Sequence, residues 1–429
     1  MGCGSTAGTA TTPLPSSSAR SSTSSSSGGG VSTGSSGSHA SSSSSASGAS
    51  SGASSSVGPS SGVAPPLAGP SDAPYTIQGP TIVGASGHPH LFRGLAYPSL
   101  EWNPAGLSAR NGGQSPGQTD FDIIQSWNAN VVRIPLNQDF WLQDNTFSSS
   151  SYQGTVDSEV GWAENDNLDV ILDLHWSDRG DPSVMQGCCP SGPGTNCSGD
   201  CQQVMADSRS LAFWKDVAAH YASDKHVLFE LYNEPHDVAL AVWLSGSPAG
   251  STVSGTSNDK SSTSSFAVVG MQQLYDAVNG AANTGSNPNH LIVVGGLQFA
   301  YDLSGISPTG TRVNGANVVY NTHPYQHNSG SASDWQAHFG FLSADYPVIA
   351  TEFGDDATSQ ATTCDATFDT NLTAYMDQKA SGTNPANKIS WTAWAFFNSG
   401  CAFPSLIMDS NYGPNAPGMV VQSTLTSGP

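Results

Sequence analysis

The sequence has few basic residues, and this scarcity excludes one class of function. Lysine and arginine together number 12, against 33 aspartate and glutamate residues, so the net charge at pH 7 is −21. Binding to nucleic acid requires a concentrated positive surface. We therefore expect no nucleic-acid partner, and instead a protein that handles neutral ligands. Long apolar runs are also missing, and none reaches the ~20 residues that a membrane-spanning helix needs.

Large apolar side chains are scarce in residues 1–70, which consist almost entirely of Ser, Gly, Thr, Ala and Pro. Such a stretch cannot bury enough apolar surface to offset the entropy lost on ordering. We interpret residues 1–70 as a disordered linker. Residues 71–429 are then left as one large domain, and their length suits a barrel with insertions.

The chain has seven cysteines, and six of them could pair. Four crowd one loop and two follow later strands: Cys188, Cys189, Cys197, Cys201, Cys364 and Cys401. This number, beside a Ser-rich linker, favours disulfide bonds and an oxidising compartment, so a secreted protein is expected. A four-cysteine zinc site in the loop is the alternative, although the adjacent pair Cys188–Cys189 is a poor ligand spacing.

Cys3 is left over, and no apolar signal segment precedes it. One interpretation is a lipid anchor on Cys3, as in a processed bacterial lipoprotein that follows an added Met-Gly, which would tether the protein to the cell surface. The alternative is myristoylation of Gly2, since Ser5 and Thr6 loosely fit that pattern. We favour the first, because a cytosolic anchor conflicts with the cysteine pattern. A third possibility is that Cys3 has no role.

Eight apolar runs alternate with helix-like segments after residue 75. The runs are residues 90–98, 130–136, 169–176, 227–234, 290–296, 317–325, 347–354 and 389–397. Most are near-continuous in Val, Ile, Leu and Phe, which is typical of strands buried on both faces of a parallel sheet. The intervening segments 119–127, with Thr119 as its cap, 207–223 and 265–282 have helical periodicity. This alternation predicts a (β/α)₈ barrel, the TIM-barrel fold, with a hairpin at 75–83 closing its bottom.

Polar and aromatic residues finish these runs. In this fold the active site lies at the carboxyl ends of the strands. The side chains found there are Arg133, His175, Asn233, Glu234, His323, Tyr325, Glu352 and Trp394. One polar residue at a strand end could be coincidental, but eight such residues at equivalent strand ends predict an active site.

Glu234 and Glu352 end strands that face each other across the predicted barrel. Two carboxylates are what hydrolysis of a glycosidic bond needs, since one protonates the leaving oxygen and the other attacks the sugar carbon. Two such close groups cannot both ionise freely, so one becomes the acid. Arg133 and Tyr325 would serve Glu352, while Asn233 would hold the sugar 2-hydroxyl. Trp394 offers an apolar face to a sugar ring.

The sequence resembles glycoside hydrolase family 5, the cellulase family of retaining barrels, over residues 75–429. The motifs that carry the resemblance are VVRIP with Arg133, LDLHW with His175, ELYNEP with Asn233 and Glu234, HPY with His323 and Tyr325, ATEFG with Glu352, and WTAW with Trp394. The resemblance implies that Glu234 is the acid/base and Glu352 the nucleophile. The loops at 97–106 and 177–205 depart from the family, which leaves the substrate open.

Less specific interpretations compete with these assignments. Glu234 could cap a following helix, and Glu352 could be a salt-bridge partner in a loop. His175 and His323 could be core histidines, or ligands of a metal site that no short spacing supports. Trp176, Trp102 and Trp141 could be packing residues, although at least one of them is expected to be a sugar platform.

Strand alternation leads to one further prediction. Residues two positions apart on a strand share a face. If the strand-end residues point into the barrel, Asp173 and Glu230 do so as well. We therefore predict a buried polar network in which Arg133 and Asn321 satisfy Asp173 and Glu230. A local bulge that flips the alternation is the alternative.

Together these features predict a secreted or surface-tethered retaining β-glycosidase that cuts internal β-1,4 bonds of a polysaccharide. Its expected substrate is a β-glucan such as cellulose, and β-mannan and other β-glucans are alternatives. Water is the second substrate, so neither a cofactor nor a metal is expected, and we expect a monomer. From other classes, a non-catalytic carbohydrate-binding protein should lack one of the glutamates, and a structural surface protein should release no reducing ends.

Overall fold

A closed barrel of parallel strands forms the centre of the protein. The computed structural model describes residues 71–109, 115–144, 148–176, 203–256, 263–285, 289–328, 330–355, 364–378, 387–398 and 404–427. Eight parallel strands follow one another around the barrel, with the last pairing to the first. They are β3 (Arg93–Ala96), β4 (Val131–Asn137), β5 (Asp169–Trp176), β6 (Val227–Glu230), β9 (Ile292–Gly295), β10 (Val318–Thr322), β11 (Val348–Ala350) and β12 (Ser390–Ala393). The predicted (β/α)₈ barrel is confirmed.

The apolar runs form strands because both faces of each strand are buried. Every residue of β4, β6 and β10 is buried, as expected for a parallel sheet covered by helices. Most of the strands are shorter than the runs that predicted them. The residues beyond each strand's end turn into the loops that carry the polar side chains.

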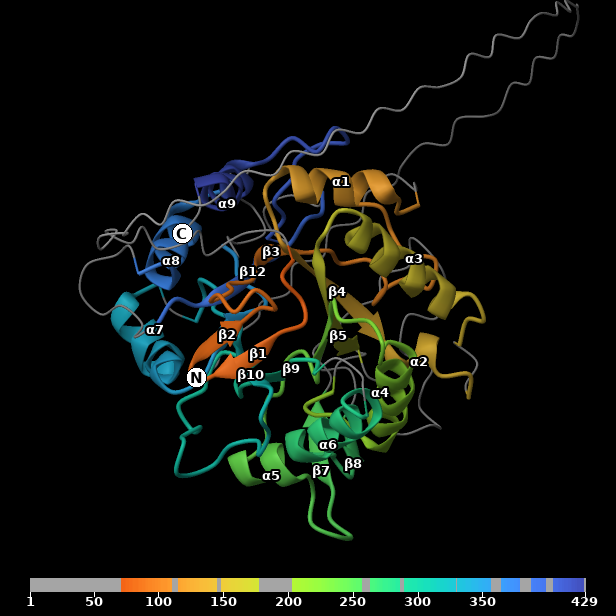
Figure 1. Ribbon diagram of the computed structural model, residues 1–429. Coiled ribbons are helices and arrows are strands. Elements are labelled where there is room, and N and C mark those ends of the chain that lie inside the picture. Colours follow the sequence, from red (N-terminus) through yellow and green to blue (C-terminus); the bar gives the residue numbers. More distant parts are fainter. Residues whose placement is uncertain are drawn as a thin grey trace, which may run out of the picture. The chain divides into compact units, whose positions relative to one another are not determined.

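Helices surround the barrel strands (Figure 1). They are α1 (Gln118–Ser126), α2 (Gln138–Trp141), α3 (Tyr152–Asn165), α4 (Ser208–His220), α5 (Leu240–Ser245), α6 (Met271–Ala282), α7 (Ala332–His338), the 3₁₀ helix η2 (Gly340–Ala344), α8 (Thr367–Met376) and α9 (Ala416–Ser427). A separate hairpin is made by β7 (Val253–Thr256) and β8 (Thr263–Phe266). Within the described ranges, no helix is both long and apolar enough to cross a bilayer.

Two of the expected helix starts were wrong. Gly117 precedes α1, so Thr119 lies within the helix and does not cap it. The predicted helix 265–282 begins at Met271, because its first residues pair with Val253 and Ser254 in the β7–β8 hairpin. Gly270 forms the boundary, where a side chain would collide with the backbone of Leu244 and Gly246. Close approach of two chain segments thus ends the helix earlier than its periodicity suggests.

The hairpin of β1 (Thr76–Gln78) and β2 (Thr81–Val83) closes one end of the barrel, as predicted. Tyr75 and Ile82 pack there on a layer of inward-facing apolar side chains from the strands. These side chains are Phe92, Val131, Ile171, Leu228, Val293, Val319 and Ile349. The next inward positions on β4, β5, β6 and β10 are polar, namely Arg133, Asp173, Glu230 and Asn321. The apolar layer thus seals the bottom, and these polar residues lie towards the carboxyl ends.

Candidate active site

Arg133 is the centre of a buried polar layer above the apolar one. Its Nε donates to Glu230 Oε2 at 2.7 Å, and its Nη2 lies 2.8 Å from Asp173 Oδ2. Asn321 Nδ2 donates to Glu230 Oε1 at 2.8 Å. All four side chains are fully buried. The predicted network is therefore confirmed, and Glu230 faces the barrel interior.

Arg133 and Glu230 stabilise each other's charge, whereas burial raises the pKa of Asp173. Burial alone would raise the pKa of Glu230, but the positive charge of Arg133, the hydrogen bonds from Arg133 and the charge of His323, whose Nε2 lies 3.8 Å from Oε1, outweigh it and lower the pKa to about 2. Burial likewise opposes the charge of Arg133, and the surrounding carboxylates raise its pKa well above the usual value. A buried cation is tolerated only when paired in this way.

Glu352 is held by this network. Arg133 Nη1 donates to its Oε1 at 2.5 Å, and the Tyr325 hydroxyl donates to its Oε2 at 2.6 Å. Thr351, the residue before it, also reaches inward and donates from Oγ1 to Glu230 Oε1 at 2.9 Å. Thr351 continues the alternation from Ile349, so the alternation breaks between Thr351 and Glu352, which both face inward. The expected contacts of Arg133 and Tyr325 with Glu352 are confirmed.

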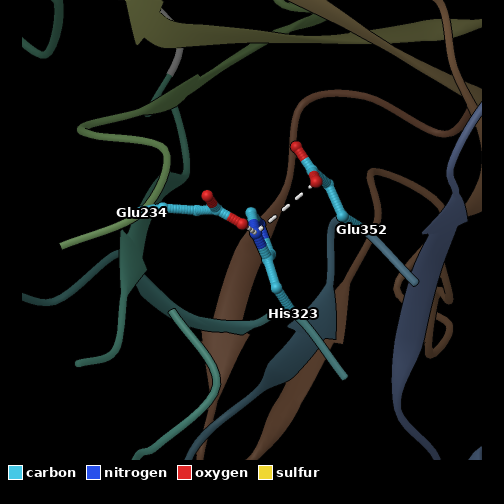
Figure 2. Close-up of side chains that lie close together, drawn as sticks. All are labelled: Glu234, His323 and Glu352. Atoms are coloured by element: carbon cyan, nitrogen blue, oxygen red, sulfur yellow. Dashed lines mark hydrogen bonds and ion pairs between the residues drawn. The ribbon is translucent and has the colours of Figure 1, made fainter. Parts of the chain in front are cut away.

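Glu234 lies opposite Glu352, and His323 lies between them (Figure 2). His323 Nδ1 is 3.0 Å from Glu234 Oε1 and 3.7 Å from Glu352 Oε2. One oxygen of each glutamate and one nitrogen of the histidine all lie within 4.8 Å of one another. The two carboxylates meet, as predicted. The capping alternative for Glu234 is wrong, because the next helix, α5, begins only at Leu240.

His323 is positively charged in this setting. Burial lowers its pKa, but the negative charge of Glu352, the nearby carboxylate of Glu230 and the hydrogen bond to Glu234 raise it to about 10. Because this value exceeds the ordinary 6.5, the contribution of His323 protonation to stability is complete below about pH 6.5. That contribution is lost as the pH rises through about 10.

We expect His323 to remain an imidazolium from about pH 6 to about pH 8, a range in which an unperturbed histidine loses its proton. Nitrogen chemical shifts of selectively labelled histidine would measure this, with assignment by a His323→Asn variant. In a Glu352→Gln variant the pKa should fall, because one attracting charge is removed. Titration of wild-type His323 near pH 6.5 would contradict the prediction.

The stacked rings of His175 and Trp394 form one wall of the site, next to Arg133 and Asp173. Their rings stack with centroids 5.5 Å apart and an interplanar angle of 5°. His175 Nδ1 lies 2.8 Å from Asp173 Oδ2, and burial lowers its pKa to about 4, so the ring is neutral. Trp394 also faces the Arg133 guanidinium, with 6.0 Å from its Cζ to the ring centroid. Asn233 is fixed beside them, since its Oδ1 accepts from Arg133 Nη2 at 2.7 Å.

The three tryptophans considered as sugar platforms differ in their surroundings. Trp141 is 1% exposed and donates from Nε1 to Asp216, so a role as sugar platform is wrong for it. Trp102 is partly buried and packs edge-on against Phe397, beside the cluster that contains Trp394. The side chain of Trp176 and residues 177–202, with four of the cysteines, lie outside the described residues. The role of Trp176 and the cysteine connectivity stay predictions.

A parallel (β/α)₈ barrel with two facing carboxylates at the carboxyl ends of its strands is the arrangement of a glycoside hydrolase. The sequence model of the family "Cellulase (glycosyl hydrolase family 5)" matches residues 94–400. The chain therefore belongs to glycosyl hydrolase family 5.

Individual relatives are more distant. The manganese dependent endoglucanase Eg5A of Phanerodontia chrysosporium is 29% identical over 138 residues, which are 31% of each chain. Glucan 1,3-beta-glucosidase I/II of Saccharomyces cerevisiae is 30% identical over 132 residues, 28% of this chain and 26% of that protein. The match thus spans less than a third of these relatives. The crystal structure of beta-glucanase SdGluc5_26A from Saccharophagus degradans has the same fold, with a TM-score of 0.58 and 19% identity over 83% of this chain and 94% of that one.

Proposed function

We propose that the protein is a retaining β-glycanase in which Glu352 is the nucleophile and Glu234 the acid/base. The observation that carries this proposal is that two carboxylates, whose oxygens approach within 4.8 Å, have different hydrogen-bond partners. A separation of about 5 Å suits direct attack, because an inverting enzyme must leave room for a water between the carboxylates. Only Glu352 receives both the Arg133 cation and the Tyr325 hydroxyl, which stabilise its charge.

The reaction takes place in two steps. Glu352 attacks the anomeric carbon while Glu234 donates a proton to the departing glycosidic oxygen, giving a covalent glycosyl-enzyme. Glu234, now a carboxylate, then takes a proton from water, and the hydroxyl displaces Glu352 with net retention of configuration. Trp394 supports the sugar that is attacked. Asn233, fixed by Arg133, is placed to hold the 2-hydroxyl beside the reacting carbon.

The substrate that we propose is a β-1,4-glucan cut internally, and the names of the cellulase and endoglucanase relatives support it. The name of the relative glucan 1,3-beta-glucosidase I/II supports a β-1,3-glucan as an alternative substrate. A β-mannan is a further alternative. Product analysis on soluble β-glucans and mannans would test the choice. Internal cleavage lowers viscosity before many reducing ends appear. Release from mannan alone would overturn the glucan assignment.

Among the described residues, Glu234, His323 and Glu352 form the group whose spacing would accept a cation. However, His323 carries a proton, and a cation would have to displace it together with the hydrogen bond to Glu234. We therefore expect dialysis against EDTA to leave the hydrolysis rate within about twofold. Activity that disappears on dialysis and returns with Mn²⁺ alone would contradict this expectation.

We also propose that the protein is secreted or tethered to the cell surface as a monomer, with the linker as a spacer and Cys3 as its lipid anchor. The cysteine count and the polar composition of residues 1–70 support this. Metabolic labelling with a radioactive fatty acid, followed by cell fractionation, would test it. A protein that is unlabelled in wild type, or equally labelled in a Cys3→Ser variant, would refute the anchor.

A further inference from the structure

Thr351 is a fully buried threonine whose hydroxyl lies between a carboxylate and a histidine ring. Its Oγ1 is 2.9 Å from Glu230 Oε1 and 3.0 Å from His323 Nε2. Glu230 is ionised and has no hydrogen to give, so the hydroxyl hydrogen of Thr351 points to Glu230. The lone pairs of Oγ1 are then left for a donor, and the Nε2–H group of His323 lies within reach of them.

Thr351 provides the acceptor that this Nε2–H group needs. Glu230 Oε1 lies 3.8 Å from Nε2, which is too long for a hydrogen bond. Asn321 Nδ2 lies 3.1 Å away, but an amide nitrogen donates and cannot accept. A buried N–H group without an acceptor is costly, and His323 is fully buried. Within the described part of the chain, Thr351 Oγ1 is therefore the atom that satisfies Nε2–H.

The other nitrogen of the same ring reaches the proposed acid/base. His323 Nδ1 is 3.0 Å from Glu234 Oε1, and Figure 2 shows the ring between the two glutamates of the site. Because the imidazole ring is rigid, an acceptor that holds Nε2 also determines where Nδ1–H points. A continuous chain of hydrogen bonds thus runs from Glu230 through Thr351 and the His323 ring to Glu234.

Thr351 is itself held from both sides. Its N–H donates to Asn321 Oδ1 at 3.0 Å, and its carbonyl accepts from Thr392 Oγ1 at 2.6 Å. Asn321 belongs to β10 and Thr392 to β12, the two neighbours of β11 in the barrel. The β-branched side chain of threonine also has few rotamers. The hydroxyl is therefore in place before a substrate binds.

We propose that Thr351 is a positioning residue for the acid/base, and that its hydroxyl acts by fixing the His323 ring against Glu234. This inference rests on the proposed function and extends it, because it gives the residue before the nucleophile a part in proton donation. The hydrogen bond from Nδ1 to Oε1 orients the carboxyl group of Glu234. In the first step the proton passes from that oriented carboxyl group to the departing glycosidic oxygen, and Glu234 becomes a carboxylate.

Two substrates separate this role from the attack by Glu352. The leaving oxygen of a β-glucan needs a proton, whereas 2,4-dinitrophenyl β-cellobioside needs none in the first step. The readout is the ratio of kcat/KM for the β-glucan to kcat/KM for the aryl glycoside. In Thr351→Val and Thr351→Ala, which lack the hydroxyl, we expect this ratio to fall about tenfold. In Thr351→Ser, which retains the hydroxyl, the ratio should stay within about threefold of wild type.

A double variant tests whether Thr351 acts through Glu234. In a Glu234→Ala background the acid is already missing, so the addition of Thr351→Val should change kcat/KM on the β-glucan by less than about twofold. A further loss of about tenfold in that background would mean that the two residues act independently, and it would overturn the proposal.

Thr322→Val is the matched control, since Thr322 is also fully buried and its Oγ1 donates to the carbonyl of Tyr301 at 2.9 Å. Its ratio should equal that of wild type. An unchanged ratio in both Thr351→Val and Thr351→Ala would refute the positioning role. So would an equal loss on the two substrates, which would mean that Thr351 only supports Glu352 or the fold. Wild-type turnover of both substrates establishes the proposed function separately. A wild type inactive on both would remove that function and this inference together.

Discussion

Replacing Glu352 with glutamine should lower kcat on a soluble β-glucan by about 10⁴-fold or more, because no other carboxylate can attack the sugar carbon. The amide has nearly the same volume and can still accept a hydrogen bond from Arg133 or Tyr325. Substrate affinity should therefore remain within a few-fold of wild type. Reducing-end assays measure the first effect, and calorimetric titration with a cello-oligosaccharide measures the second. A non-catalytic carbohydrate-binding protein would be unaffected in both assays.

Chemical rescue distinguishes the nucleophile from a merely structural carboxylate. In Glu352→Gly, azide can occupy the vacated space and attack an activated aryl β-cellobioside directly. A single displacement inverts the anomeric carbon, so the expected product is the α-glycosyl azide. The control is Glu164→Gln at the end of α3, which removes a glutamate away from the site and should retain wild-type turnover. Activity of Glu352→Gln within tenfold of wild type, or a β-configured azide from Glu352→Gly, would refute the nucleophile assignment.

The barrel was predictable because its strands are buried on both faces and so leave near-continuous apolar runs in the sequence. Helix boundaries were less predictable, because they depend on contacts between segments. The segment from Ser265 to Gly270 has helical periodicity, yet Ser265 and Phe266 pair with another strand and Gly270 touches the backbone of Leu244. Local preference was overruled there by tertiary packing.

The site residues were predicted from the strand ends and from the alternation of side chains along each strand. Both sequence signals miss some side chains. Alternation correctly placed Glu230 and Asp173 inside, but it would turn Thr351 or Glu352 away, whereas both face inward where β11 ends. Trp141 looked like a platform candidate because exposure cannot be read from residue type, and α2 buries it.

The acid/base assignment predicts an effect that depends on the leaving group. Glu234→Ala should lower kcat/KM on a β-glucan by about 10³-fold, within the range of a general acid, because the departing sugar alkoxide needs a proton. A 2,4-dinitrophenyl β-cellobioside needs none, since its phenolate leaves readily. The first step should then proceed at nearly the wild-type rate, while hydrolysis of the glycosyl-enzyme becomes slow because no base activates water.

Stopped-flow absorbance should accordingly detect a burst of dinitrophenolate, close to one equivalent of enzyme, followed by slow turnover. Azide should accelerate that slow phase about 10-fold or more and yield the β-glycosyl azide, since it attacks the intermediate without needing a base. This configuration is opposite to the product expected from Glu352→Gly, so the two variants assign the two roles independently of how much activity each loses. Equal losses on both substrates without a burst would mean that Glu234 only positions His323. The proton would then have to come from another group that lines the cavity beside Glu234.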